Sequence, residues 1–282
     1  MKAPSTKSIS IGELELEAKE LRRLILRTTH RAGIGHTGGS LSEADILVAL
    51  YFRVMGGIDP SEPGKATRDR FILSKGHATP GYYSALALRG YFPVEALETF
   101  DELGTMLQAH PDMHKAPGVD MSTGSLGQGL SCGLGMAHAS RRSPELGSFR
   151  TFVLMGDGEL QEGQVWEAAL YAGAKKTPLI VAIVDDNRVQ LASTTDEAVS
   201  VAPLAEKWRA FGWTALEVDG HDMGALVAAL KEARELAAYG PVVVLARTVK
   251  GKGVSFMEGR YEWHGKAPDD GQFEAAMQEL QS

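Results

Sequence analysis

The chain has 282 residues, of which 44% are hydrophobic, and its formal net charge is −7. A chain of this size buries roughly three quarters of the surface it exposes when unfolded, so it can form one large core. The negative charge and the lack of a long basic run argue against nucleic acid and anionic membranes as partners. The sequence shows no long apolar run and no basic-plus-apolar leader, which predicts a cytoplasmic protein.

Helix-like and strand-like segments alternate along the chain. Apolar residues recur at helical spacing from Leu14 and stop at Gly33, and residues 1–13 are expected to form a flexible N-terminus. The sequence Ser40-Leu41-Ser42-Glu43 is typical of a capping box that opens a helix ending near residue 55. Strand-like runs follow at 70–73, 151–155, 179–185, 214–218 and 241–247. The alternation predicts a single α/β domain over residues 1–282, with a mostly parallel sheet covered by helices on both faces.

Two polar residues follow consecutive strand-like runs. Asp157 lies in Gly156-Asp157-Gly158 after one run, and Asn187 comes after the next. If these strands are parallel neighbours joined by a helix over 160–174, both side chains lie at the carboxyl edge of one sheet, where such sheets bind ligands. Their oxygens suit a hard cation such as Mg²⁺, or Ca²⁺ or Mn²⁺. Further ligands are expected from a diphosphate, which the glycines let backbone N–H groups approach, and from a main-chain carbonyl near Val189.

The glycines between Gly127 and Gly133 imitate a dinucleotide-binding loop. Residues 117–124 precede them instead of the buried strand that such a loop requires, so the sequence argues against this interpretation. The glycines are expected to allow close packing against a bound diphosphate or a neighbouring subunit. Cys132 is the only cysteine, which excludes an intrachain disulfide, and within an Ala/Gly-rich helix it is expected to be buried.

From about Leu21 to His264 the sequence resembles the transketolase family of thiamine-diphosphate enzymes. Seven motifs appear in the family's order and approximate spacing. They are Gly35-His36-Thr37-Gly38, Leu73-Ser74-Lys75-Gly76-His77-Ala78, His110-Pro111, Thr123-Gly124-Ser125-Leu126-Gly127-Gln128-Gly129, Gly156-Asp157-Gly158 with Glu162, Asp185-Asp186-Asn187, and His264. Any single motif can arise by chance, whereas seven in register identify the family.

The resemblance implies a role for four histidines. His36, His77, His110 and His264 would line the funnel around the reactive carbon of thiamine diphosphate and hydrogen-bond the hydroxyls and carbonyl of a sugar. Imidazole suits this task because its ordinary pKa, near 6.5, lets it donate, accept or carry a proton near neutral pH. Thr37 stands where the family commonly has Pro, and the loop before His264 departs from the usual pattern. The remaining histidines match no motif and are expected to be structural.

The resemblance also implies a set of cofactor contacts. Asp157, Asn187 and the carbonyl of Val189 would hold the metal. Glu162 would belong to a buried acid network near the subunit interface, in which carboxyl groups share protons. The contacts to thiamine diphosphate would come from His77, Gly124, Leu126, Gly156, Asp157, Gly158, Glu162, Asn187 and His264.

In the family, the acid that faces the aminopyrimidine ring belongs to a second domain supplied by the other subunit. This chain stops at Ser282, so the pyrimidine-binding and C-terminal domains are expected on a separate partner chain, in an α2β2 assembly. The expected activity is transfer of a two-carbon ketol unit from a ketose phosphate to an aldose phosphate. We expect it only when the partner is present.

Two other functions share these features. Deoxyxylulose-phosphate synthase and the alpha subunits of 2-oxo acid dehydrogenases use the same fold and the same metal site. The early Gly-His-Thr-Gly and the Thr-Gly-Ser-Leu-Gly-Gln-Gly sequence favour transketolase. A non-catalytic binding or regulatory homologue is the remaining alternative, and the intact metal ligands and histidines argue against it.

Overall fold

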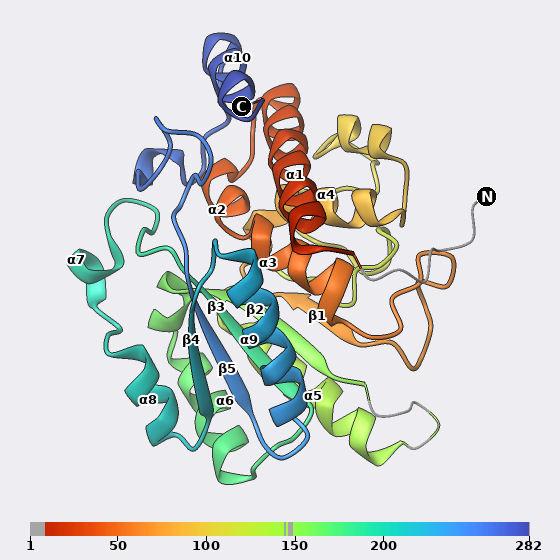
Figure 1. Cartoon of the computed structure of the whole chain (residues 1–282), viewed down its shortest axis with the longest axis vertical. Helices are drawn as coiled ribbons and strands as arrows, with labels where there is room; N and C mark the ends of the chain where they lie inside the picture. Colours follow the sequence, from red (N-terminus) through yellow and green to blue (C-terminus); the bar gives the residue numbers. More distant parts are fainter. Residues whose placement is uncertain (1–8, 144, 146–148, 282) are drawn as a thin grey trace.

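The computed structural model describes residues 9–143, 145 and 149–281. They form a five-stranded sheet in the order β1-β2-β3-β5-β4, and all neighbouring strands are parallel. The strands are β1 (Arg70–Leu73), β2 (Thr151–Gly156), β3 (Ile180–Asp186), β4 (Thr214–Asp219) and β5 (Val242–Arg247). Helices cover both faces (Figure 1), so the predicted α/β class is confirmed and each strand lies within one residue of its expected bounds.

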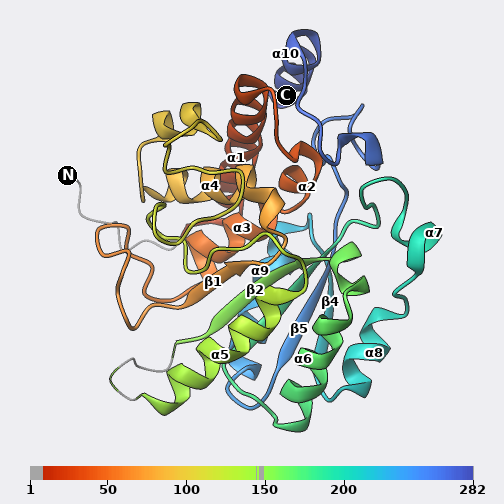
Figure 2. The same ribbon diagram turned by 180° about the vertical axis from the view of Figure 1, so that it is seen from behind.

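The helices divide between the two faces of the sheet. In Figure 1, α9 (Met223–Leu236) crosses in front of the strands, and in Figure 2, α5 (Gln128–Arg142) and α6 (Gly163–Ala174) cross in front of the other face. The other helical elements are α1 (Ile11–Ala32), α2 (Thr37–Ser42), α3 (Ala44–Ala49), η1 (Leu50–Val54), η2 (Gly76–Ala78), α4 (Thr79–Arg89), η3 (Val94–Thr99), η5 (Gly158–Gln161), α7 (Thr195–Val199), α8 (Leu204–Ala210), η6 (Tyr261–Trp263) and α10 (Asp270–Glu279).

Alternating side chains of each strand build two hydrophobic cores. Phe152 and Leu154 of β2 pack with residues of α1, α3, α4 and α9 on one face. Val153 and Met155 pack with residues of α5, α6 and α8 on the other. Because both faces are covered, β2, β3 and β5 are apolar over most of their length, as buried parallel sheets require, whereas the edge strand β4 exposes Thr214, Glu217 and Asp219. Polar residues lie at the edge formed by the carboxyl ends of the strands.

Two expected helix starts differ from the structure. Residues 1–8 lie outside the described residues, so the flexible start expected there stays a prediction. Helix α1 begins at Ile11 with Ser10 and Glu13 as a capping box, so residues 11–13 are helical and not part of a flexible segment. The capping box expected at Ser40 does not form. The hydroxyl of Ser40 instead donates to the carbonyl of His36 at 2.9 Å, inside a helix that begins at Thr37. The sequence pattern was misleading because Glu43 is turned into the protein, where it meets a buried lysine.

The helix expected over 160–174 and the burial of Cys132 also need correction. A 3-10 turn over Gly158–Gln161 follows β2, and α6 begins only at Gly163. Cys132 is exposed, because the buried face of α5 is formed by Leu130, Leu134 and Ala137. An added Cβ at Gly129 would clash with the hydroxyl of Ser74, so this glycine allows close packing within the chain.

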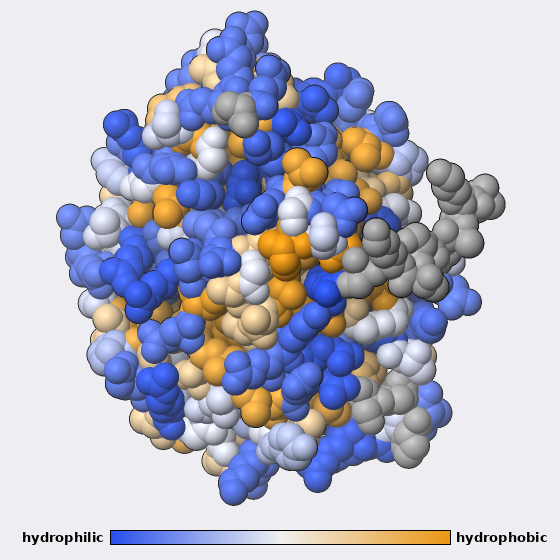
Figure 3. Space-filling view, in the orientation of Figure 1, coloured by the Kyte–Doolittle hydropathy of each residue, from blue (hydrophilic) through white to orange (hydrophobic). Residues whose placement is uncertain are grey.

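Hydrophilic residues cover most of the molecular face seen in Figure 3, with smaller hydrophobic groups between them. Within the described residues, no helix is both long and apolar enough to cross a membrane. The cytoplasmic location expected from the sequence stays a prediction.

Candidate active site

A cavity of about 560 Å³ opens at the carboxyl ends of β2 and β3. Every residue predicted for the metal, the cofactor or catalysis lines it. The full lining is His36, Gly39, Lys75, His77, His110, Gly124, Leu126, Gly156, Asp157, Gly158, Glu159, Gln161, Glu162, Asn187, Val189, Gln190, Leu191, Lys250 and His264. The fold therefore gathers segments from residue 36 to residue 264 into one site. The roles of the individual residues stay predictions.

Asp157 lies at the sheet edge as the sequence predicts. Strands β2 and β3 pair in register, with Gly156 opposite Asp185, so Asp157 and Asn187 follow neighbouring strands. The Asp157 carboxylate accepts hydrogen bonds from the backbone N–H of Gly158 at 2.9 Å and of Arg188 at 2.7 Å. Burial, together with the carboxylates of Asp185 and Asp186, raises the pKa of Asp157 to about 7. A carboxyl group with two other carboxylates nearby is suited to bind a cation.

Asn187 is oriented by its neighbours. Its amide nitrogen donates to the carboxylate of Asp185 at 3.0 Å, which fixes the amide so that its oxygen faces the other way. That oxygen accepts from the N–H of Val189 at 3.1 Å and keeps a second lone pair. Within the part of the chain that the structure describes, the carbonyl of Val189 takes no backbone N–H. An amide oxygen and a main-chain carbonyl are thus available beside Asp157.

These oxygens fit a hard cation that is also held by a diphosphate. Over residues 9–143, 145 and 149–281, no group of three or more His, Cys, Asp or Glu side chains is arranged to hold a metal ion. A cation here would depend on one carboxylate, one amide, one carbonyl and oxygens of the ligand, which is an ordinary set for Mg²⁺. Gly156 and Gly158 leave the backbone open at this edge for close approach by phosphate.

Glu159 is a buried acid that the sequence analysis did not single out. Its side chain is 3% exposed and accepts from the Ser74 hydroxyl at 2.5 Å and the N–H groups of Gly127 and Gly156 at 2.8 and 3.2 Å. It thereby ties the Gly-Asp-Gly turn to the start of α5. Glu162, in contrast, is exposed at the cavity rim in the single chain. Its membership of a buried acid network stays a prediction about the assembly.

Lys75 forms a buried ionic cluster under the cavity. Its ammonium lies 2.5 Å from the Asp185 carboxylate and 2.9 Å from that of Glu43, and it donates to the carbonyl of Gly39 at 3.3 Å. Burial opposes the charge, but Asp185 and Glu43 hold the pKa of Lys75 above its usual value. Burial raises the pKa of Glu43 to about 8 despite the lysine. Asp185 also accepts from the hydroxyls of Ser42 and Thr248.

Three imidazoles form a triangle on the other wall of the cavity. The ring centroids of His36, His77 and His264 lie 4.8 to 5.3 Å apart. Burial, followed by nearby positive groups, lowers the pKa of each ring, that of His264 to about 3. All three are therefore neutral at pH 7, with one donor and one acceptor each. His110 completes the wall from the rim, where its ring packs 3.3 Å from the position of a Cβ on Gly124.

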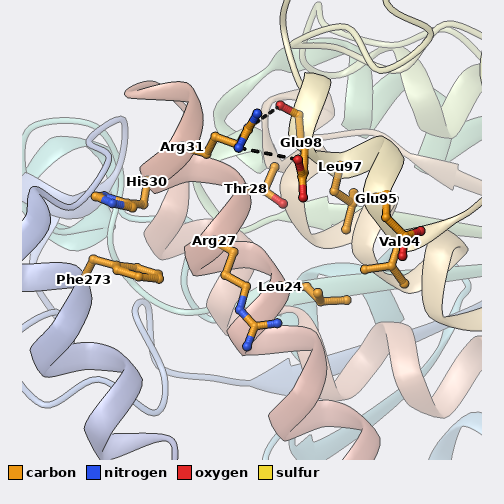
Figure 4. A pocket seen from close by; sticks show the side chains of 10 residues that line it. All are labelled: Leu24, Arg27, Thr28, His30, Arg31, Val94, Glu95, Leu97, Glu98 and Phe273. Carbon is orange, nitrogen blue, oxygen red and sulfur yellow. Dashed lines mark hydrogen bonds and ion pairs between the residues drawn. The ribbon is translucent and has the colours of Figure 1, made fainter.

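The histidines that match no motif lie elsewhere. His221 bridges Asp45 and the N–H of Val249, and His138 of α5 packs its ring against Tyr171 of α6. His30 lines a second cavity of about 490 Å³ between α1, η3 and α10 (Figure 4). In that cavity Arg31 pairs with Glu98, and none of the residues predicted for catalysis contributes to the lining. The second cavity is separate from the candidate active site.

Comparisons with known proteins identify the family of the chain. Residues 15–281 match the family model described as transketolase, thiamine diphosphate binding domain. The chain is 45% identical over 269 residues to the 6-deoxy-6-sulfo-D-fructose transketolase subunit SqwG of Clostridium sp. (strain MSTE9), covering 95% of this chain and 96% of that protein. It is 44% identical over 276 residues to one subunit of the apulose-4-phosphate transketolase of Actinobacillus succinogenes, covering 97% of this chain and 98% of that protein.

Single-chain transketolases share the fold over part of their length. The structure of transketolase from Campylobacter jejuni matches with a TM-score of 0.90 at 30% identity, over 97% of this chain and 43% of that one. Rat transketolase is 36% identical over 94% of this chain and 41% of its own length. The chain thus spans nearly all of the two subunit relatives and less than half of the single-chain enzymes. The chain belongs to the transketolase family and corresponds to its thiamine diphosphate binding domain.

Proposed function

We propose that the chain is one subunit of a two-chain transketolase, the subunit that holds the diphosphate and metal. The observation that carries this proposal is a cavity that brings Asp157 and Asn187 together with a histidine wall, and whose rim is exposed at Glu162 and Leu191. A partner chain with the pyrimidine-binding and C-terminal domains would cover this rim, in an α2β2 assembly. The names of the two subunit relatives support such a division.

The metal end holds and orients the cofactor. Asp157, Asn187 and the Val189 carbonyl would bind Mg²⁺, and the backbone of the Gly156-Asp157-Gly158 turn would approach the diphosphate. When bound, thiamine diphosphate supplies the electron sink that allows the carbon–carbon bond beside a ketose carbonyl to break. The buried Glu159 keeps the turn fixed by its bond to the N–H of Gly156.

The histidine wall would bind and orient the sugar. Because their pKa values are lowered, His36, His77 and His264 are neutral. His36 and His77 can each donate to a carbonyl and accept from a hydroxyl, whereas Nδ1 of His264 is bonded to Lys250 and leaves one ring nitrogen for the sugar. Those at the reacting carbons can also move a proton between hydroxyl and carbonyl oxygens. His110 at the rim would contact the sugar as it enters.

The ketose donor is proposed to carry an anionic group at its far end. The names of the two subunit relatives give 6-deoxy-6-sulfo-D-fructose and apulose-4-phosphate, which both do. The described cavity lining includes no arginine, and both of its lysines already have protein partners. The anionic end of the sugar would therefore be recognised mainly by the partner chain.

Reconstitution tests this function. The purified chain, alone and with its partner subunit, is assayed with thiamine diphosphate, Mg²⁺ and an aldose phosphate acceptor. The donors are 6-deoxy-6-sulfo-D-fructose, apulose 4-phosphate and xylulose 5-phosphate. We expect background rates from the chain alone and ketol transfer from at least one donor in the complex. The Asp157→Ala complex serves as the control for contaminating host transketolase, whose activity this change leaves intact.

Two results would contradict the proposal. Turnover by the single chain that disappears with Asp157→Ala would show that no partner is needed. A complex that binds the cofactor but transfers no ketol unit from any of the three donors would show that the activity is a different one.

A further inference from the structure

Lys250 is a buried cation with a single polar partner. Its side chain is 2% exposed, and over the described residues its ammonium forms one hydrogen bond, with Nδ1 of His264 at 2.7 Å. A protonated lysine has three N–H donors and no acceptor. The ammonium therefore donates to Nδ1, and the neutral ring must carry its hydrogen on Nε2.

We propose that Lys250 is the positioning residue for His264: it selects the Nε2–H tautomer and turns that donor to the cavity. The kinetic consequence rests on the proposed function, whereas the tautomer itself does not. His264 lines the cavity beside His36 and His77, so its free nitrogen is the one offered to a ligand. Without the lysine, a neutral imidazole is free to carry its hydrogen on either nitrogen.

The stem of Lys250 is held in place by close backbone packing. A Cβ added at Gly38 would lie 2.9 Å from the Lys250 Cγ atom and 2.7 Å from the carbonyl of Trp263. The backbone N–H of Gly251 donates to the Gly38 carbonyl at 3.0 Å. The first residues of α2 are thus packed onto both the lysine and the residue that precedes His264.

A second set of contacts fixes the backbone on the other side of Lys250. The N–H of Val249 donates to Nε2 of His221 at 2.8 Å, and Nδ1 of His221 lies 2.7 Å from the carboxylate of Asp45. Arg22 pairs with the same carboxylate at 2.6 Å. Lys250 is therefore anchored from α1, α3 and the loop after β4, which gives its ammonium a defined direction.

The charges around the ammonium agree with a role other than ion pairing. Burial and the neighbouring Lys75 lower the pKa of Lys250 to about 8, against the attraction of Asp185 and Asp157. A lysine kept for stability is expected to have a carboxylate in contact, as Lys75 has. Lys250 instead contacts an imidazole. The bond to this neutral ring does not offset the free energy lost when the ammonium is removed from water.

Histidine tautomers can be read directly by nuclear magnetic resonance. In the full chain labelled with ¹⁵N-histidine, at pH 7, the protonated and unprotonated ring nitrogens give distinct ¹⁵N shifts, and His264→Gln assigns the signal. We expect a single Nε2–H tautomer in the wild type and a mixture of both tautomers in Lys250→Met. Lys250→Arg should restore the wild-type pattern because arginine also only donates. Lys252→Met, in the same loop but paired with Glu258, should change nothing.

Steady-state kinetics of the reconstituted complex give the second readout. Lys250→Met is expected to lower kcat/KM at least 10-fold without lowering the melting temperature, and Lys250→Arg to recover part of the loss. An unchanged single tautomer in Lys250→Met, or an Nδ1–H tautomer in the wild type, would overturn the positioning role. A changed tautomer with unchanged kinetics would support the positioning role and overturn the assignment of His264 to the active site.

Discussion

The two ends of the cavity hold their polar groups in different ways. At the proposed metal end, Lys75 contacts two carboxylates and a carbonyl, and Asp157 accepts two backbone N–H groups. At the histidine end, Lys250 has one imidazole as its partner, and the rings of His36 and His77 contact other rings. The first end is built like a structural core, whereas among Lys250, His36, His77 and His264 of the second end the described residues form one side-chain hydrogen bond, between Lys250 and His264.

The contrast between the two lysines shows why equal burial does not mean equal function. Both side chains are no more than 3% exposed. Carboxylates hold the pKa of Lys75 above its usual value despite burial, whereas burial and Lys75 lower that of Lys250 to about 8. We infer that Lys75 stabilises the fold and that Lys250 is retained for the site at some cost in stability.

The largest effect on stability is expected from Lys75→Met. The change leaves the Asp185 carboxylate buried without its cation and Glu43 buried without its polar partner, which should lower the free energy of unfolding by about 3–5 kcal/mol. Urea unfolding of the full chain at pH 7 measures this, with Lys252→Met as the control at a half-buried surface pair. A loss below about 1 kcal/mol would remove the structural role assigned to the cluster.

Asp157→Ala should have the next largest effect, on cofactor binding. Loss of the charged metal ligand is expected to weaken binding of thiamine diphosphate by on the order of 3 kcal/mol or more. Titration of the assembled complex with the cofactor at fixed Mg²⁺ measures the affinity. The exposed Asp196, which accepts from Ser200, provides the Asp196→Ala control. Equal affinities in both variants would place the metal elsewhere.

Alanine at the histidine wall should reduce catalysis and spare the fold. His77→Ala and His110→Ala are each expected to lower kcat or raise KM roughly 10 to 1000-fold, the span for a lost catalytic hydrogen bond or proton carrier. Melting temperatures should change little. His138→Ala, on α5 against Tyr171, should keep the kinetics of the folded fraction. Loss of activity only in proportion to lost folded protein would contradict the roles assigned to His77 and His110.

The smallest expected effect is a gain in stability from Lys250→Met. The folded-state pKa of Lys250 is lowered from 10.5 to about 8 by burial and Lys75, against the attraction of Asp185 and Asp157, while its bond partner His264 is neutral. Between these two pH values the unfolded chain binds more protons, so the lysine's destabilising effect is full below pH 8 and fades towards pH 10.5.

Scanning calorimetry of the full chain tests this dependence of stability on pH. Lys250→Met should melt at a higher temperature than the wild type at pH 7, and the difference should shrink towards pH 10. A variant that melts at a lower temperature at pH 7 would make Lys250 a stabilising residue like Lys75, and the contrast between the two ends would fail.

The sheet and the meeting of Asp157 and Asn187 at its edge could be predicted because their signals are local. Each strand is a short apolar run, and parallel strands bring Asp157 and Asn187 to one edge whatever the details of packing. The histidines were located by the family motifs, since nothing in the residues around a single histidine places it opposite another. In the structure, the ring centroids of His36 and His264 lie 5.3 Å apart, although the two residues are far apart in the sequence.

The ionic clusters could not be predicted, because their partners are far apart in the sequence. Lys75 and Asp185 are separated by 110 residues, and each also fits an interpretation as a solvated surface charge. Glu43 was misread as a cap because the pattern Ser40-Leu41-Ser42-Glu43 does not reveal which way its last side chain points. The contact of Lys250 with His264 was not predicted either, because the sequence does not reveal which way the lysine side chain points. Lys250 nevertheless lies in the loop that leads to His264.

The most direct test of the division of the cavity is a crystal structure of the reconstituted complex with thiamine diphosphate and Mn²⁺, whose anomalous scattering locates the metal. We predict Mn²⁺ bound by Asp157, Asn187 and the Val189 carbonyl together with the diphosphate, and the reacting carbon of the cofactor facing His36, His77 and His264. A metal held by other residues, or a cofactor whose reacting carbon faces away from the histidines, would contradict it.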